Sequence, residues 1–157
     1  MVYWFTGQPG AGKTVLGKKL HEFIETEKRN WRQNVFHLDG DDLRELTVNK
    51  DYTPKGREIN IRNAHMITEY IHKTGCDVVV SLVAPPRWLR EELKERIGLE
   101  HFQEFYVHCS DTRERDHFHS KNYEAPETNF IDVNTTKDSP EKSFSKIINQ
   151  LTKLNKL

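Results

Sequence analysis

The chain of 157 residues has few cysteines, no excess of one charge and no long apolar run. Its two cysteines, Cys76 and Cys109, are far apart and form no C-x-x-C pair, which favours reduced thiols in a cytoplasmic protein over a disulfide framework. Lysine plus arginine and aspartate plus glutamate each number 24, so no general attraction to nucleic acid or to an anionic membrane is expected. No apolar run approaches the length of a membrane span, and no signal-peptide pattern precedes the first apolar residues. These absences predict a soluble, cytoplasmic protein that forms one domain over residues 1–157.

The most informative stretch that is present is glycine-rich. Residues 7–14 (GQPGAGKT) satisfy the spacing G-x-x-x-x-G-K-[ST], between an apolar run at residues 2–5 and a stretch with apolar residues at helical spacing. In this pattern backbone N–H groups surround phosphates, the lysine reaches the β- and γ-phosphates, and the threonine hydroxyl can ligate Mg²⁺. We therefore predict a nucleotide triphosphate and Mg²⁺ as cofactors. The residues expected to bind them are Gly7, Gly10, Gly12, Lys13 and Thr14.

Apolar runs and amphipathic stretches alternate along the rest of the chain. We expect strands at residues 2–5, 35–38, 77–84, 103–109 and 129–134, and helices after the glycine-rich loop and at residues 42–46, 57–74, 87–96 and from 140 onward. This alternation predicts an α/β fold of the P-loop NTPase and kinase type, with a mostly parallel central sheet and helices on both faces. Residues 110–128 are polar and lack a sustained period, so we expect a lid there that closes over the phosphates.

Two carboxylates follow the expected second strand. Because ligands of open α/β sheets lie beyond the carboxyl ends of the strands, Asp39 and Asp41 should face the same crevice as the glycine-rich loop. In a kinase, one carboxylate could hold Mg²⁺ through water and the other could orient or deprotonate an acceptor hydroxyl. Arg57 and Asn60, three residues apart on the first turn of a helix, could contact one ligand together. The arginines that could neutralise charge on the transferred group are Arg44, Arg57, Arg87, Arg113 and Arg115.

A phosphate-binding loop is compatible with three functions: phosphoryl transfer, hydrolysis coupled to motion, and switching. A switch needs an N-K-x-D guanine reader after a late strand, but the nearest match, residues 49–51, lies in an early loop with the aspartate one position early. The chain has no room for the accessory elements of a mechanical ATPase. A kinase for a small molecule is therefore favoured. A catalytically inactive nucleotide-binding module is the alternative from another class, and the intact Lys13, Thr14, Asp39 and Asp41 argue against it.

Four strings behind the loop resemble the adenylylsulfate kinases. They are FHLDGDDLR (36–44), YTPKGREINIRNA (52–64), VVVSLVAPPR (78–87) and NYEAPE (122–127). Enzymes of this family use ATP to phosphorylate the 3′-hydroxyl of adenylyl sulfate, so the resemblance implies a transferase of sulfate assimilation with a nucleotide acceptor. Family members often dimerise, and the resemblance therefore allows a homodimer.

The resemblance also implies roles for individual residues. Asp41 would position the 3′-hydroxyl, with Lys13 and Asp39 as further catalytic residues and with Thr14 and Asp41 at the metal. Tyr52 stands where the family usually has a phenylalanine that stacks on the acceptor base. Arg113 is assigned to the nucleotide cofactor. The residues assigned to the acceptor are Asp39, Arg44, Tyr52, Arg57, Asn60, Val83, Ala84 and Lys121.

Two departures from the family pattern qualify these expectations. Ala84 replaces a serine sometimes proposed as a phosphoenzyme residue, so we expect direct in-line transfer. The family's lid has a basic KGLYKKAR-like stretch and then KNFTGID before YEAP, and both are reduced here to RERDHFHSKNYEAP. Lys121 or Phe118 would have to replace the lysine and phenylalanine of the missing segment. The shortened lid leaves two acceptors open: adenylyl sulfate, which we expect, and cytidine diphosphoramidate, the acceptor of a related kinase in capsular polysaccharide modification.

Overall fold

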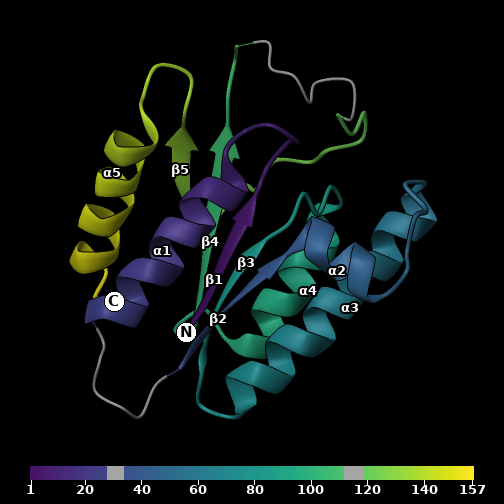
Figure 1. The fold of residues 1–157 in the computed structure, drawn as a ribbon, viewed down its shortest axis with the longest axis horizontal. Coiled ribbons are helices and arrows are strands. Elements are labelled where there is room, and N and C mark those ends of the chain that lie inside the picture. The colour runs from purple at the N-terminus through teal and green to yellow at the C-terminus, as the bar shows by residue number, and fades with distance from the viewer. Residues whose placement is uncertain (28–33, 112–118) are drawn as a thin grey trace.

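The computed structural model describes residues 1–27, 34–111 and 119–157. In these residues five strands form one sheet in the order β2-β3-β1-β4-β5, and all four pairings are parallel (Figure 1). The predicted parallel α/β fold is therefore confirmed. The strands are β1 (Val2–Thr6), β2 (Val35–Asp39), β3 (Asp77–Ser81), β4 (Phe102–His108) and β5 (Phe130–Asn134).

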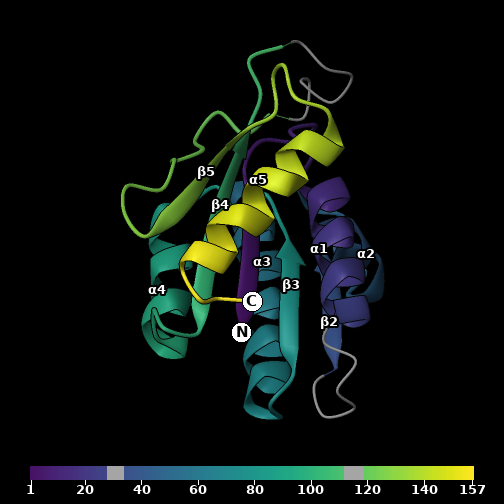
Figure 2. The ribbon, with the colours of Figure 1, turned by 90° about the vertical axis from the view of Figure 1, so that its left-hand side faces the viewer.

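Helices cover both faces of the sheet, as the sequence predicts. Helices α1 and α5 lie on one face, and α3 and α4 lie on the other (Figures 1 and 2). The central strand β1 is buried throughout: Tyr3 and Phe5 pack into the core beneath α1 and α5, whereas Val2 and Trp4 pack into the core on the opposite face. This alternation is the period of two expected of a strand that is covered on both sides. The helices are α1 (Lys13–Glu27), α2 (Gly40–Leu46), α3 (Pro54–Lys73), α4 (Arg87–Ile97) and α5 (Pro140–Lys153).

Two helices begin earlier than the sequence analysis expected. The side chain of Thr53 accepts a hydrogen bond from the Gly56 N–H and Pro54 occupies the first helical position, so α3 starts three residues before Arg57. Arg57, whose N–H bonds to the Thr53 carbonyl oxygen, consequently closes the first turn, and Asn60 lies in the second. Helix α2 starts at Gly40 because Asp39 caps it, and Arg44 therefore lies in the last turn of this helix and not near its start.

Strand β3 ends three residues before the predicted end at Ala84. After Ser81 the chain leaves the sheet, and Ala84 adopts a positive φ of 41°, which is incompatible with a strand. The apolar composition continues past the strand because these residues are buried in the core on the α3 and α4 face. Within the described part of the chain, no helix has the length and apolar character needed to cross a membrane.

Candidate active site

The glycine-rich loop connects the end of β1 to the start of α1. Its three glycines adopt positive φ values, 145° at Gly7, 82° at Gly10 and 104° at Gly12, a region that residues with a side chain rarely adopt. At Gly7 a Cβ atom would also lie 1.9 Å from the Val107 carbonyl oxygen, so only glycine fits there. The loop ends at Lys13, the first residue of α1, which places the positive end of the helix dipole at the loop. This is the geometry of a phosphate-binding loop.

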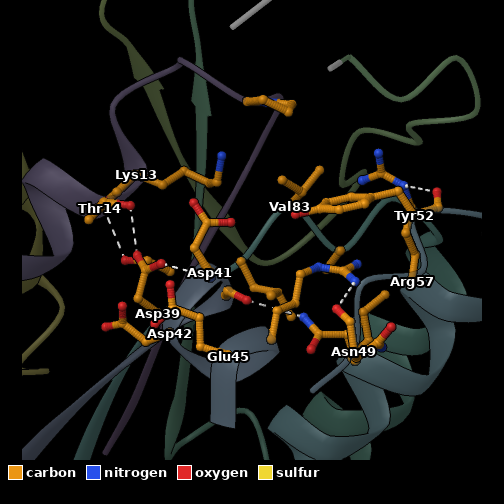
Figure 3. A pocket seen from close by; sticks show the side chains of 18 of the residues that line it. Lys13, Thr14, Asp39, Asp41, Asp42, Glu45, Asn49, Tyr52, Arg57 and Val83 are labelled. Carbon is orange, nitrogen blue, oxygen red and sulfur yellow. Dashed lines mark hydrogen bonds between the residues drawn. The ribbon is translucent and has the colours of Figure 1, made fainter. Parts of the chain in front are cut away.

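Thr14 and Asp39 form a direct pair at the edge of the sheet. The Thr14 hydroxyl donates to Asp39 Oδ2 over 2.7 Å, and Asp39 Oδ1 accepts from the backbone N–H of Asp41 over 2.9 Å (Figure 3). The described residues contain no group of three or more His, Cys, Asp or Glu side chains that could hold a metal ion. A hydroxyl and a carboxylate next to a phosphate site fit Mg²⁺, which takes few protein oxygens together with phosphates and waters. The sequence analysis paired Thr14 with Asp41 at the metal, and in the structure the partner of the hydroxyl is Asp39.

Lys13 and Asp41 meet in front of the loop. Lys13 is buried, and its Nζ donates to the Gln8 carbonyl oxygen over 2.8 Å. Figure 3 shows the Asp41 side chain directed toward the Lys13 amine, whereas Asp42 points away from it. An amine that can reach phosphates and a carboxylate that can meet a hydroxyl therefore lie side by side.

One cavity of about 1070 Å³ joins this loop to the start of α3. Its volume exceeds the upper end of the roughly 300–1,000 Å³ typical of single-ligand sites, so two substrates can share it. Of the residues singled out in the sequence, Gly7, Arg87 and Lys121 are not in its lining. Arg113, Arg115 and Phe118 lie outside the described residues. The predicted residues that line the cavity are Gly10, Gly12, Lys13, Thr14, Asp39, Asp41, Arg44, Tyr52, Arg57, Asn60, Val83 and Ala84.

Tyr52 forms an aromatic platform between two arginines at the far end of this cavity. The Arg44 guanidinium lies 4.3 Å from the centre of the Tyr52 ring, and that of Arg57 lies 5.8 Å away. Arg44 is held in place because its Nη1 donates to the carbonyl oxygens of Asn49 (3.2 Å) and Asp51 (2.8 Å). Burial lowers the pKa of Arg44, which as an arginine still stays cationic at neutral pH. Tyr52 is 55% exposed, so the ring and the two cations offer a surface to a planar base and an anionic group.

Asn60 carries an unused acceptor at the floor of the cavity. Its Nδ2 donates to the Gly40 carbonyl oxygen over 3.4 Å, but its buried Oδ1 has no hydrogen-bond partner among the described residues. A buried polar atom without a partner is costly, so a ligand that donates a hydrogen bond here would satisfy it. Asn60 and Arg57 both line the cavity, which is compatible with the prediction that they contact one ligand.

Residues 1–143, most of the chain, match the family model described as adenylylsulphate kinase. The chain belongs to the adenylylsulphate kinase family. Curated adenylyl-sulfate kinases of Staphylococcus haemolyticus and Pseudomonas aeruginosa are each 30% identical to it over 96% of this chain, and the matches cover 83% and 84% of those proteins. The solved structure of the Mycobacterium tuberculosis APS kinase in complex with AMPPNP and APS aligns with a TM-score of 0.76 over 96% of both chains. At 18% identity, this likeness shows the shared fold.

Sequence reasoning missed a polar chain that supports the loop of this adenylylsulphate kinase family member. Ser81 Oγ donates to the Lys13 carbonyl oxygen over 3.2 Å, and His37 Nε2 lies 3.0 Å from Ser81 Oγ. A Cβ atom at Gly17 would lie 2.3 Å from Ser81 Oγ, so the close approach of α1 to this pair requires glycine. Burial lowers the pKa of His37, which keeps its ring neutral at physiological pH. The signal was available: Ser81 is a polar residue at the carboxyl end of a buried strand, as Asp39 is.

Sequence reasoning also missed a contact between the phosphate-binding loop and the predicted lid. The Gln8 side-chain amide donates to the Ser120 carbonyl oxygen over 3.0 Å, and the Ser120 N–H donates to Gln8 Oε1 over 2.9 Å. His119 Nε2 lies 3.2 Å from the carbonyl oxygen of Pro9 in the same loop. The described end of the predicted lid is thus bonded to the glycine-rich loop. No pattern in the sequence marks residues 112 positions apart as partners.

Proposed function

We propose that the protein transfers the γ-phosphate of ATP to the 3′-hydroxyl of adenylyl sulfate, which gives 3′-phosphoadenylyl sulfate and ADP. The observation that carries the proposal is the single cavity in which a phosphate-binding loop, two carboxylates and an aromatic platform between two arginines lie together. Membership of the adenylylsulphate kinase family supports this acceptor, as do two curated relatives named adenylyl-sulfate kinase.

The phosphate end of the cavity binds ATP. The backbone of Gly10 and Gly12 and the Lys13 amine contact the β- and γ-phosphates. Thr14 and Asp39 are the residues that would hold Mg²⁺, and Asp41 stays a predicted further ligand. When bound, Mg²⁺ supplies positive charge to the phosphate oxygens. Gly7, outside the cavity lining, acts by letting the loop turn tightly against Val107.

Asp41 acts as the general base for the acceptor hydroxyl. Its carboxylate orients the 3′-hydroxyl and accepts its proton while the hydroxyl oxygen bonds to the γ-phosphorus. The bond between that phosphorus and the bridging oxygen breaks at the same time, so ADP leaves with the electron pair. Lys13 compensates the charge on the transferred group. A phosphoenzyme cannot form at position 84, because Ala84 has no hydroxyl, so the transfer is direct.

The other end of the cavity binds the acceptor. The Tyr52 ring stacks on the base, Arg44 and Arg57 compensate the charge of the phosphosulfate, and the free Oδ1 of Asn60 accepts a hydrogen bond. The segment with Val83 and Ala84 forms the wall beside the platform.

A lid over residues 110–128 completes the proposal. We assign Arg113 to ATP and Lys121 to the acceptor within it; Arg113 lies outside the described residues, and Lys121 would have to move to reach the cavity. The chain acts as one kinase domain over residues 1–157. We further propose that it works as a homodimer, as the family resemblance allows.

Incubation of the protein with ATP, Mg²⁺ and adenylyl sulfate tests the proposal, with the product identified by mass and phosphorus NMR. We expect one additional phosphate on the 3′-oxygen and stoichiometric ADP. Lys13→Ala should abolish turnover, because the lysine is the side chain that reaches the phosphates. Unchanged turnover in Lys13→Ala would remove the argument from the phosphate-binding loop.

A further inference from the structure

The segment between β3 and α4 has an unusual backbone where it lines the acceptor end of the cavity. Ala84 has a φ of 41° although it is not glycine, and it is fully buried. Such conformations cost free energy and persist only where the surroundings determine them. Here three consecutive carbonyl oxygens, those of Val83, Ala84 and Pro85, each accept a hydrogen bond from outside the segment. The backbone conformation of residues 83–85 is therefore determined by the groups that donate to these carbonyl oxygens.

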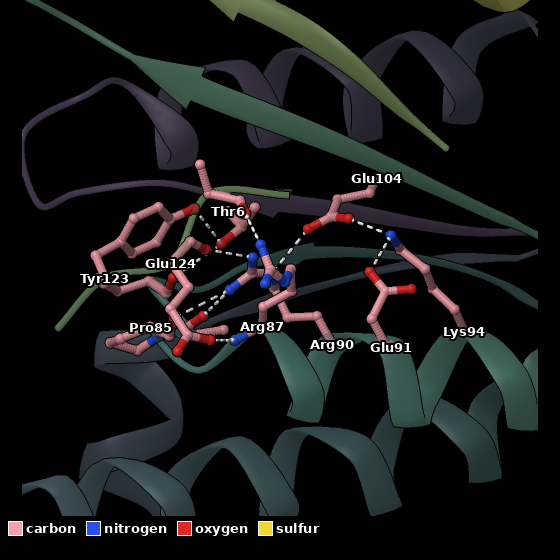
Figure 4. Close-up of polar contacts among 12 residues, drawn as sticks. Thr6, Pro85, Arg87, Arg90, Glu91, Lys94, Glu104, Tyr123 and Glu124 are labelled. Atoms are coloured by element: carbon pink, nitrogen blue, oxygen red, sulfur yellow. Dashed lines mark hydrogen bonds and ion pairs between the residues drawn. The ribbon is translucent and has the colours of Figure 1, made fainter. Parts of the chain in front are cut away.

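The main partner is Arg90 in α4, whose side chain is completely buried. Its Nη1 donates to the carbonyl oxygens of Ala84 (2.5 Å) and Pro85 (3.3 Å), and its Nε donates to Glu104 Oε1 in β4 over 2.8 Å (Figure 4). A buried guanidinium is tolerated because a carboxylate and several carbonyl oxygens satisfy it. Thr6 Oγ1 donates to the third carbonyl oxygen, that of Val83, over 2.9 Å.

The same guanidinium holds the end of the predicted lid. Arg90 Nη2 donates to the Glu124 carbonyl oxygen over 2.6 Å, and the Glu124 N–H returns a bond to the Pro85 carbonyl oxygen over 3.0 Å. The Tyr123 hydroxyl lies 2.9 Å from Thr6 Oγ1, and its ring lies 5.5 Å from the Arg90 guanidinium (Figure 4). Residues 123–124 and residues 83–85 are thus fixed by one set of groups.

We propose that Arg90 is a positioning residue that couples the acceptor wall, residues 83–85, to the base of the lid, residues 123–124. It lies outside the cavity lining and acts on substrate only through these two segments. Its planar fork serves four acceptors at once, which the single ammonium of a lysine cannot reproduce. The identity of the acceptor rests on the function proposed above, whereas the coupling itself does not.

The kinetic test compares Arg90→Lys with Lys94→Gln. Lys94 is a matched control because it is also buried in α4 and its Nζ lies 2.5 Å from Glu104 Oε2. Its other partners in the described part of the chain are Glu91 and the Thr128 carbonyl oxygen, not residues 83–85 or 123–124. Arg90→Lys should raise the KM for adenylyl sulfate about tenfold or more, the factor expected for loss of one hydrogen bond to a charged group. The KM for ATP should rise by a smaller factor, because Arg90 bonds directly to the acceptor wall and is linked to the phosphate-binding loop only through the lid. Lys94→Gln should leave both KM values near those of the parent.

Hydrogen exchange supplies a measurement that does not depend on activity. The Glu124 N–H bonds to the Pro85 carbonyl oxygen, and the Arg87 N–H at the start of α4 bonds to Glu124 Oε2. Both should exchange faster in Arg90→Lys and retain parental rates in Lys94→Gln. If Arg90→Lys fails to fold, Tyr123→Phe replaces it, since loss of the hydroxyl near Thr6 should shift the same KM and the same amides by a smaller factor.

Equal rises in both KM values, or unchanged exchange at Glu124 and Arg87, would overturn the coupling. Failure of the parent protein to phosphorylate adenylyl sulfate would instead overturn the proposed function. In that case the exchange rates alone decide whether Arg90 couples the two segments.

Discussion

Replacing Asp41 by asparagine removes the carboxylate that we assign to the acceptor hydroxyl but leaves its surroundings in place. The cap of α2 depends on the Asp41 backbone N–H and the side chain of Asp39, and neither changes. Loss of one negative charge in the first turn of a helix costs about 0.3–1 kcal/mol of stability, little beside the roughly 5–15 kcal/mol of a typical domain. Loss of a general base lowers kcat by about 10²–10⁴-fold, or roughly 3–5 kcal/mol in the barrier. Catalysis should therefore suffer far more than folding.

The assay is steady-state release of ADP with ATP, Mg²⁺ and adenylyl sulfate, together with ATP binding by calorimetry and thermal unfolding. Asp41→Asn should bind ATP and unfold at nearly the parental temperature, yet turn over at least about a hundredfold more slowly. Asp42→Asn is the matched control, because Asp42 is also in the first turn of α2 but points away from Lys13 (Figure 3). A kcat for Asp41→Asn within about tenfold of the parent, or an equal loss in Asp42→Asn, would refute the assignment.

Three further predictions follow from the platform, the loop contact and a buried histidine. In steady-state kinetics Tyr52→Phe should leave the KM for the acceptor nearly unchanged, whereas Tyr52→Leu should raise it roughly 5- to 150-fold, since stacking on an aromatic ring is worth about 1–3 kcal/mol per base. An equal KM for the acceptor in the two variants would argue against stacking. Gln8→Leu removes both side-chain hydrogen bonds to the Ser120 backbone and should raise the KM for ATP about three- to tenfold. Ser120→Ala should leave this KM unchanged, because both bonds use backbone groups of Ser120. A similar KM for ATP in the two variants would contradict a role for this contact. Burial lowers the pKa of His65 to about 4, with the nearby Arg96 and Arg62 contributing, so as the pH falls below about 6.5 the unfolded state binds the proton first. Between pH 7 and 5 the unfolding free energy, measured by urea denaturation, should therefore drop by about 2 kcal/mol more in the parent than in His65→Phe. An equal dependence of the unfolding free energy on pH in the two proteins would count against a buried neutral ring.

The phosphate-binding loop and the carboxylates could be predicted because their signals are local. The spacing of Lys13 and Thr14 from the glycines encodes the loop, and Asp39 and Asp41 come directly after an apolar run. The start of α3 was missed although its signal, Thr53 followed by Pro54, was present within a polar stretch that resembled a loop. The end of β3 was misplaced because apolar composition reports burial, and residues after Ser81 remain buried outside the sheet.

Several contacts that hold the acceptor wall could not be predicted, because they join residues distant in sequence. Arg90 and Glu124 are 34 positions apart, and Thr6 and Val83 are 77 apart. Nothing in the pattern around Arg90 distinguishes it from the exposed charges of α4, since the helix is rich in both signs. Only the tertiary arrangement shows that this arginine is buried beside the acceptor wall.

The most direct test of the proposed acceptor is a comparison of kcat/KM for adenylyl sulfate and cytidine diphosphoramidate, with ATP and Mg²⁺ held constant and the products identified by mass. The two acceptors differ in base and in leaving anion, which are the groups that the Tyr52 platform and its two arginines would contact. We predict a clear preference for adenylyl sulfate. A preference for the cytidine acceptor would contradict the proposed function, and phosphorylation of neither would also contradict it and would favour a catalytically inactive nucleotide-binding module.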